Sequence, residues 1–453
     1  MLKKSVAFIT ILSLSACNLA TYQPLQTIEQ LNPQSGYRMK DVIKQQDSNL
    51  ILLMFSGGGS RAAALGYGVL EQFKHTPVKS GRQEGNLLEN IDLVYGVSGG
   101  SLLAAYFALQ GADVIPKFEN DFLKKNFQSE VINQVLSFSN LPRLTSPQFG
   151  RGDLLQEQLN LVLYRNATFA DLAHKRKGPF AVISATDMNI GQKITFTQEF
   201  FDGLCLNLND LEIARAVAAS SSVPLIFSPL TLNNNGGNCN YTIPELAILE
   251  ASESDGGLKS KNIEEVKNIL SLYQNSKERP FIHLVDGGLT DNLGLSSLTD
   301  IYDVMGQEKI YRKALESGLK RIVVINVNAQ NEVTSEIDQS ADVPGVTDVV
   351  NTIINVPIDR NTQITLRRFR EFAEQWNKNM RKIPAPDRVE LYFVSLSLKD
   401  LPESPLRKEV LNISTSFYLP ASDINKLKRA AQILLENSTE YRTMLKSLQQ
   451  SGK

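Results

Sequence analysis

The sequence predicts an α/β domain in which helices cover a mainly parallel sheet. Continuous apolar runs of strand length occur at residues 49–55 (NLILLMF) and 91–97 (IDLVYGV), and such runs are typical of strands buried on both faces. A helical stretch follows each run, at 64–73 (ALGYGVLEQF) and 101–110 (SLLAAYFALQ). Strands that alternate with helices in this way indicate parallel βαβ units.

The alternation continues along the chain. We expect a helix at 211–221 (LEIARAVAASS) and further strands at 180–188, 193–200, 281–288, 320–329 and 389–398. Residues 47–330 are therefore assigned to the main domain. Residues 331–453 are assigned to a C-terminal α/β extension that packs on it.

Residues 231–280 interrupt this pattern. They contain the polar, glycine-bearing stretches LNNNGGNCNYT and ASESDGGLKSKN. Long insertions of this kind are usually surface loops or lids. We interpret the segment as a lid insertion that is mobile and controls access to a site on the main domain.

A second amphipathic stretch, TLRRFREFAEQWNKNMRK, lies in the C-terminal extension. One helical face carries the apolar residues Leu366, Phe369, Ala373, Trp376 and Met380. A face of this kind packs on a core or rests on anionic lipid, and a core face is the more common use.

The N-terminus predicts export. Two lysines precede an apolar run and the sequence LSAC, which is the layout of a secretory signal; the alternative is a buried N-terminal helix. LSAC resembles a bacterial lipobox, in which the cysteine, here Cys17, becomes the acylated first residue. Residues 1–16 are then a lipoprotein signal peptide and residues 17–46 a tether. Asn18 favours the outer membrane, facing the periplasm, over retention in the inner membrane of the bacterial cell envelope.

The composition limits the kinds of partner that the protein is expected to bind. The formal net charge of −1 gives no indication of a nucleic-acid partner. No apolar run of membrane-spanning length follows the first twenty residues. Beyond Cys17 the chain has only Cys205 and Cys239, which in an oxidising compartment either pair as a disulfide or remain two separate buried thiols.

The first candidate catalytic motif is G-x-S-x-G, formed by Gly96, Ser98 and Gly100. It lies between a buried strand and a helix of small residues, where a sharp turn exposes the serine oxygen and bulky neighbours would clash. The helix that follows favours developing negative charge at its N-terminus. The alternative is a glycine turn that only lets strand and helix pack closely.

The second candidate is a carboxylate. Asp286 follows an apolar strand and precedes Gly287 and Gly288. Ligand sites in open α/β sheets lie outside the carboxyl ends of strands, where Ser98 is also expected. The alternative is an aspartate that caps the glycine turn. The histidines are His75, His174 and His283, and each is more typical of an ordinary surface or core residue than of a base.

The third candidate is the glycine run Gly57, Gly58 and Gly59, again between a strand and a helix. Consecutive glycines present backbone N–H groups to an anion, as an acyl-transfer oxyanion requires. Arg61 adds positive charge. The G-K-[ST] ending of a phosphate loop is absent, and position 62 is alanine where a dinucleotide loop has glycine. A glycine turn without a ligand remains the alternative.

Taken together, GGGSR, GVSGG and DGG, in that order, resemble the three motifs of patatin-like phospholipases. The stretches AVAASSSVPLIFSPL and ISATDMNIGQKITFTQ are similar in kind to blocks of that family, and the whole resemblance spans roughly residues 50–330. It implies a three-layer α/β/α domain with a Ser–Asp dyad that cleaves acyl esters of phospholipids or other lipids, without cofactor or metal. Ser98 is then the nucleophile, Asp286 the base and Gly57 to Gly59 the oxyanion hole. Ala62 and the 231–280 insertion depart from the family pattern.

Two other functions remain open at this point. A histidine-dependent α/β-hydrolase esterase would need His283 as its base. His283 lies three residues before Asp286 on the same strand, and an offset of three puts the two side chains on opposite faces of the sheet. A catalytically inactive lipoprotein that binds lipid with the same fold is the second alternative.

Overall fold

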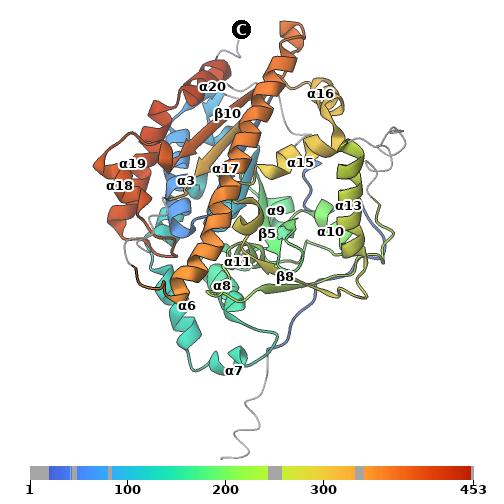
Figure 1. The fold of residues 1–453 in the computed structure, drawn as a ribbon, viewed down its shortest axis with the longest axis vertical. Helices are drawn as coiled ribbons and strands as arrows, with labels where there is room; N and C mark the ends of the chain where they lie inside the picture. The colour runs from blue at the N-terminus through green and yellow to red at the C-terminus, as the bar shows by residue number, and fades with distance from the viewer. Residues whose placement is uncertain are drawn as a thin grey trace, which may run out of the picture.

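The computed structural model describes residues 20–40, 42, 48–79, 84–242, 258–331 and 341–449. An eight-stranded sheet forms its centre (Figure 1). Seven strands follow the order β10-β9-β1-β4-β5-β8-β7, and β6 pairs with β5. The strands are β1 (Asn49–Phe55), β4 (Leu93–Val97), β5 (Phe180–Asp187), β6 (Lys193–Thr195), β7 (Leu230–Asn233), β8 (Phe281–Val285), β9 (Arg321–Asn328) and β10 (Glu390–Ser397). A separate hairpin pairs β2 (Pro77–Lys79) with β3 (Glu84–Asn86).

The α-helices connect and cover these strands. Along the chain they are α3 (Gly59–Lys74), α4 (Gly99–Gln110), α5 (Val114–Phe118), α6 (Phe127–Leu136), α7 (Leu141–Leu144), α8 (Arg151–Leu159), α9 (Phe169–Lys175), α10 (Gln198–Gly203), α11 (Ile213–Ser220), α13 (Leu258–Gln274), α14 (Gly288–Asp291), α15 (Ser296–Met305), α16 (Gln307–Glu316), α17 (Val346–Met380), α18 (Pro405–Leu411), α19 (Ala421–Asn437) and α20 (Thr439–Gln449).

The predicted α/β class with a mainly parallel sheet is confirmed. Strands β10, β9, β1, β4 and β5 are all parallel. Parallel crossovers are right-handed, so the connections through α3 and α4, which step from β1 to β4 to β5, put these helices on one face. The connection through α17 steps in the opposite direction, from β9 to β10, and puts α17 on the other face, where α15 packs against it. Helix α19 packs against α3 and also contacts β10, so it extends the first layer across the sheet.

The core explains why the apolar runs form the central strands. Every residue of β4 and β5 is buried, as are all residues of β1 except Leu50. Burying one large aliphatic or aromatic side chain contributes about 1.5–3 kcal/mol, so a strand that is apolar on both sides is most stable in the middle of the sheet. The apolar stripe of α17 is also a core face, since all five of its residues are buried.

Strand β8 enters the sheet in the opposite direction. It pairs antiparallel with β5 over two residues only, Thr186↔Val285 and Asp187↔Leu284, and β7 continues the sheet antiparallel to β8. Most of β8 lies beyond the carboxyl end of β5, and only its last two residues pair with β5. The C-terminal end of β8 is therefore at the carboxyl edge of the parallel strands. Asp286 follows directly.

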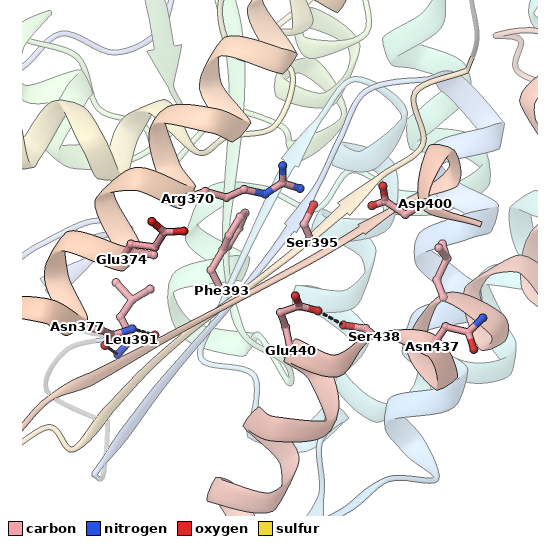
Figure 2. A pocket seen from close by; sticks show the side chains of 12 residues that line it. Arg370, Glu374, Asn377, Leu391, Phe393, Ser395, Asp400, Asn437, Ser438 and Glu440 are labelled. Atoms are coloured by element: carbon pink, nitrogen blue, oxygen red, sulfur yellow. Dashed lines mark hydrogen bonds between the residues drawn. The ribbon is translucent and has the colours of Figure 1, made fainter. Parts of the chain in front are cut away.

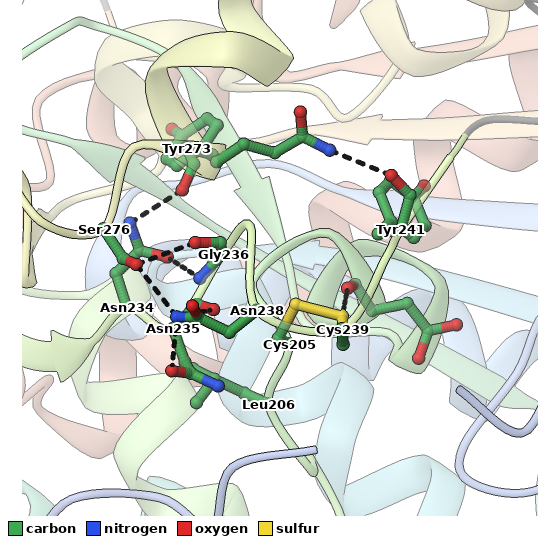
Figure 3. The surroundings of a disulfide bond; sticks show 12 residues. Cys205, Leu206, Asn234, Asn235, Gly236, Asn238, Cys239, Tyr241, Tyr273 and Ser276 are labelled. Carbon is green, nitrogen blue, oxygen red and sulfur yellow. Dashed lines mark hydrogen bonds between the residues drawn. A yellow bond between two sulfur atoms is a disulfide. The ribbon is translucent and has the colours of Figure 1, made fainter. Parts of the chain in front are cut away.

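The segment at 231–280 is more structured in its described part than a surface loop. It contributes most of β7 and all of α13 to the fold. Figure 3 shows the disulfide that joins Cys239 of this segment to Cys205 of the main domain. Tyr273 of α13 donates to the buried carboxylate of Asp187, which also forms an ion pair with Arg279. The middle of the predicted lid, residues 243–257, lies outside the described residues.

Residues 20–40, from the stretch assigned to a tether, pack on the domain. The backbone N–H of Leu25 donates to Asn233, and the hydroxyl of Tyr37 bonds to both backbone groups of Ala181. Arg38 forms a buried ion pair with Asp202 at 2.7 Å. This stretch is therefore part of the folded unit. The predicted signal peptide and the predicted acylation site, Cys17, lie outside the described residues.

Candidate active site

Ser98 occupies a strained turn between β4 and α4. Its backbone has φ 49° and ψ −124°, a conformation that costs a non-glycine residue about 1–3 kcal/mol. The flanking glycines are required by close contacts. A Cβ on Gly96 would lie 2.6 Å from Cα of Ser101, and a Cβ on Gly100 would lie 2.6 Å from the carbonyl oxygen of Ser56. The strain holds the Ser98 side chain at the carboxyl edge of the sheet.

The hydroxyl of Ser98 donates to Oδ2 of Asp286 at 2.7 Å. The two residues are 188 positions apart in sequence, and each is only 6% exposed. The other carboxylate oxygen, Oδ1, accepts the backbone N–H of Gly288 at 2.8 Å. The carboxylate is therefore fixed on one side by its own turn and bonded to the serine on the other.

Burial changes the acidity of this carboxyl. It raises the pKa of Asp286 to about 6, although the hydrogen bonds from Ser98 and Gly288 act in the opposite direction. Desolvation disfavours the charged form, whereas donors to the carboxylate favour it. A carboxyl with a pKa near 6 is a stronger base than an ordinary aspartate, yet it is still ionised at neutral pH.

Helix α11 and the serines at its end connect the two residues. Oγ of Ser220 accepts the backbone N–H of Ser98 at 2.8 Å, and the carbonyl of Ser220 accepts the N–H of Gly287. The carbonyl of Ser222 accepts the N–H of Asp286. The SSS stretch thus supports both turns. Sequence reasoning noted it only as a similar block, because nothing in a run of serines tells which hydroxyl faces the neighbouring strand.

The glycine loop lies against the serine turn, but its three N–H groups are not equivalent. A Cβ on Gly99 would lie 2.0 Å from the carbonyl oxygen of Gly59, so the two loops touch at their backbones. The N–H of Gly57 donates to the carbonyl and to Oδ1 of Asn292, at 3.2 and 3.1 Å. The N–H of Gly57 is therefore already bonded to Asn292. This corrects the prediction that all three glycines donate to the oxyanion, because the Gly57 N–H is not free to do so.

Gly58 and Gly59 remain as candidate oxyanion donors. They are the N-cap and first residue of α3, with φ of 134° and 59°, and N–H groups at a helix start have no partner within the helix. In the described part of the chain, neither N–H has a hydrogen-bond acceptor. The next residue, Ser60, donates its N–H to the carbonyl of Ser416, so the loop is held from the C-terminal segment.

The buried side chain of Arg61 packs against the Gly57–Gly59 loop. It is 2% exposed and donates to the carbonyl oxygens of Ala329 and Ile413. Burial lowers the pKa of Arg61 to about 10, so the side chain remains charged at neutral pH. A Cβ on Gly58 would lie 3.2 Å from Nη2 of Arg61, which puts this charge beneath the loop.

The three histidines lie elsewhere. His75 caps the C-terminus of α3, His174 is near the end of α9, and both are exposed. His283 is exposed on β8, where Nδ1 lies 3.1 Å from Oγ1 of Thr231. The side chain bonded to the buried Ser98 hydroxyl is Asp286. This arrangement counts against the histidine-dependent alternative.

Other features give no competing centre. Among the described residues, no group of three or more His, Cys, Asp or Glu could hold a metal ion, and none of the described helices is long and apolar enough to cross a membrane. A cavity of about 530 Å³ lies between α17, β10 and the α19–α20 corner, lined by Arg370, Glu374, Asp400 and Glu440 among others (Figure 2). Its lining shares no residue with the Ser98 site.

Comparison with known proteins decides the family. The sequence profile of patatin-like phospholipases matches residues 53–299, more than half of the chain. The chain belongs to the patatin-like phospholipase family. The matched range contains the Gly57–Gly59 loop, Ser98 and Asp286, and patatin-like phospholipases are typically serine esterases acting on lipid acyl groups. No curated protein sequence matches the chain.

Solved structures resemble this patatin-like phospholipase at low identity. The human GIVD cytosolic phospholipase A2 shares 12% identity over 90% of this chain, with a TM-score of 0.40. VipD from Legionella pneumophila shares 11% identity over 95% of this chain and 71% of its own, with a TM-score of 0.30. The present chain spans 64% of the length of the human phospholipase chain.

Proposed function

We propose that this protein is a lipid acyl hydrolase of the phospholipase or lysophospholipase type, with Ser98 as nucleophile and Asp286 as general base. The observation that carries the proposal is the 2.7 Å hydrogen bond from Oγ of Ser98 to Oδ2 of Asp286. Both side chains are buried, and the residue pattern at each turn is that of the family.

In the acylation step, Asp286 takes the hydroxyl proton while Oγ of Ser98 attacks the ester carbonyl carbon. The carbonyl oxygen becomes an oxyanion, which the N–H groups of Gly58 and Gly59 stabilise. The start of α4 adds a favourable dipole. The tetrahedral intermediate then collapses, and Asp286 returns its proton to the departing alcohol of the lipid.

In the deacylation step, Asp286 accepts a proton from water, and the hydroxide attacks the acyl-enzyme carbonyl. Collapse releases the fatty acid and restores the Ser98 hydroxyl with the proton from Asp286. The same carboxylate therefore acts as base and then acid in each half of the reaction. Its raised pKa suits both roles, because proton transfer is most efficient when the pKa is near the working pH.

We further propose that the mature protein is acylated at Cys17 and anchored to a membrane of the bacterial cell envelope, most simply the outer membrane facing the periplasm. The support is the LSAC sequence after a short apolar run. An anchored enzyme would meet its phospholipid substrate at the membrane surface.

The direct test is covalent labelling. Purified protein is treated with a serine-directed fluorophosphonate, digested and mapped by mass spectrometry. Labelling at Ser98, absent from Ser98→Ala, supports the proposal. A folded protein that remains unlabelled, or that is labelled at another serine, contradicts it and favours a lipid-binding protein with the same fold.

A further inference from the structure

Three exposed apolar segments stand out on the surface. The first joins α6 and α7, where Leu136 and Phe138 are 70% and 90% exposed. The second follows α11, where Leu225 and Ile226 are 66% and 56% exposed. The third is the start of α17. Large contiguous exposed apolar patches are rare on soluble proteins and mark interaction sites.

The second segment lies beside the catalytic edge and is connected to α6, the helix that leads into the first segment. Leu225 follows Ser222, whose carbonyl holds the N–H of Asp286, by three residues, a reach of about 10 Å at most. Phe417 links the second segment to α6, since its ring packs against Phe127 at the start of α6 and against Phe227. Arg151 donates to the carbonyl of Leu225 from the start of α8.

Helix α17 extends past the same edge. Its C-terminal part is bonded to the beginning of β10, through Trp376 and Val389, whereas Asp359 in its middle forms an ion pair with Lys399 just after the end of β10. The helix therefore runs antiparallel to β10. Residues 346–358 continue beyond the carboxyl edge for up to about 20 Å, and Figure 1 shows α6, α7 and one end of α17 at the same end of the molecule.

The projecting part of α17 is amphipathic. Its exposed apolar residues Val346, Val349, Ile353 and Val356 recur at intervals of three and four, so they form one stripe along the helix. The residues that pack on the domain, such as Thr362 and Leu366, lie on the other side of the helix. No described residue covers the stripe, whose members are 44–82% exposed.

The described chain begins next to these segments. The carbonyl of Ala20 accepts the hydroxyl of Ser146, two residues after α7, and the N–H of Tyr22 donates to Gln148. Cys17 is three residues before Ala20, so an acyl group on Cys17 would start within about 10 Å of Ala20. A membrane that holds this anchor would face the end of the molecule that carries α6 and α7.

We propose that these three apolar segments form a docking face that inserts into the surface of a phospholipid bilayer and presents the Ser98 site to it. The proposal rests on the proposed function for the acylation of Cys17 and for the substrate. Insertion is driven by apolar contact, because α6 has no basic residue and α17 has none before Arg360. The nearby Arg143 and Arg151 are bound to Glu157 and to the carbonyl of Leu225. Binding therefore depends little on lipid charge or salt.

The test uses a chain that starts at Asn18, which keeps every described element and lacks the anchor. The Ser98→Ala substitution is added to this chain so that hydrolysis of the vesicle lipid does not affect the binding measurement. Sedimentation with vesicles of phosphatidylcholine, and of equal parts phosphatidylcholine and phosphatidylglycerol, is expected to capture the protein similarly. The double variants Leu136→Ser/Phe138→Ser and Val349→Ser/Ile353→Ser should each weaken partition about tenfold or more, since each pair loses well over 1.4 kcal/mol of apolar burial.

Ile301→Ser/Leu315→Ser is the matched control. Both residues are exposed, at 44% and 37%, on α15 and α16, which lie away from α6 and α7 (Figure 1), so partition should be unchanged. With Ser98 restored, the docking variants should lose hydrolysis of vesicle phospholipid and retain hydrolysis of a soluble short-chain ester. A parent chain that binds vesicles but hydrolyses neither substrate contradicts only the proposed function.

Two results overturn the docking face. One is equal vesicle binding by the parent, the docking variants and the control. The other is a parent chain that does not bind vesicles and sediments as a dimer in analytical ultracentrifugation, when the docking variants sediment as monomers. That result would assign the face to a second copy of the chain.

Discussion

Oγ of Ser220 accepts the backbone N–H of Ser98 at 2.8 Å, so a residue of α11 fixes the turn that carries the candidate nucleophile. We expect Ser220→Ala to lower kcat about tenfold to a hundredfold with little change in KM, because a buried N–H without its partner costs about 1–3 kcal/mol and the strained turn relaxes. Ser222→Ala is the matched control. The Ser222 hydroxyl donates to Ala218, and only its carbonyl supports Asp286. Equal kinetics of the two variants would contradict the assigned role.

Replacement of the candidate base separates a dyad from a triad. Asp286→Asn should abolish ester hydrolysis, because an amide cannot accept the Ser98 proton, whereas His75→Gln, His174→Gln and His283→Gln should each retain most activity. Circular dichroism confirms that each variant is folded. An active Asp286→Asn, or one folded but inactive histidine variant, would show that the base has been misassigned.

The pH dependence follows from the raised pKa of Asp286. Only the deprotonated carboxylate can accept the serine proton, so kcat/KM for a soluble ester should rise as pH increases through about 6 and level off above pH 7. A profile that rises near pH 4 would mean that the carboxyl is not desolvated in solution.

The same pKa has a consequence for stability. A carboxyl whose folded pKa lies above its unfolded value binds protons more tightly in the folded protein. Its stabilising contribution is present below about pH 4 and is lost as pH rises through about 6. Asp286→Asn should therefore raise the free energy of unfolding at pH 7.5 by up to about 3 kcal/mol, and much less at pH 4. Denaturant melts at the two pH values measure this difference.

The disulfide should contribute substantially to stability. In the chain-entropy account, closing a loop of 34 residues contributes about 3–4 kcal/mol, so Cys239→Ser should lower the free energy of unfolding by roughly that amount. Intact mass after alkylation without reductant should show both thiols protected in protein from an oxidising compartment. Two alkylated cysteines in folded protein would exclude the bond.

The anchor has its own test. Cys17→Ser should remove incorporated lipid label and release much of the protein from membrane fractions of the expressing cell. An unlabelled parent protein, or a variant that keeps its lipid label, would exclude acylation at this residue. The docking variants described above serve as a reference for membrane contact that does not depend on the acyl group.

Local patterns were sufficient for most of the sheet. Apolar runs predicted β1, β4, β5, β8, β9 and β10. Full burial on both faces leaves a direct mark on the composition of β4 and β5, and the partly buried β8 and β10 keep enough apolar residues to be recognised. Strand β7 was hidden because its four residues, LTLN, begin a polar insertion. The second half of the expected strand at 193–200 became α10, where Thr197 and Gln198 leave the sheet.

The candidate site also had one part that the sequence predicted and one part that it did not. Glycines beside Ser98 and Asp286 are visible in sequence because the close backbone contacts exclude side chains. The contacts of Ser220 and Asn292 were not predictable, since each depends on which neighbouring turn the folded sheet brings within hydrogen-bond reach. The different use of the Gly57 N–H follows from Asn292 and was missed for the same reason.

The direction of β8 bears on how this protein can change over evolution. The β7–β8 hairpin opens at Asn233 and Phe281, whereas Asp286 follows the opposite end of β8. Segments of different length can therefore be accommodated between these two strands without displacing the carboxylate, because each doubling of a loop costs only about 0.6 kcal/mol. The turn at Ser98 allows no such variation, since its backbone touches Gly59. Insertions and deletions among related proteins should accumulate between β7 and β8 and be excluded between β4 and α4.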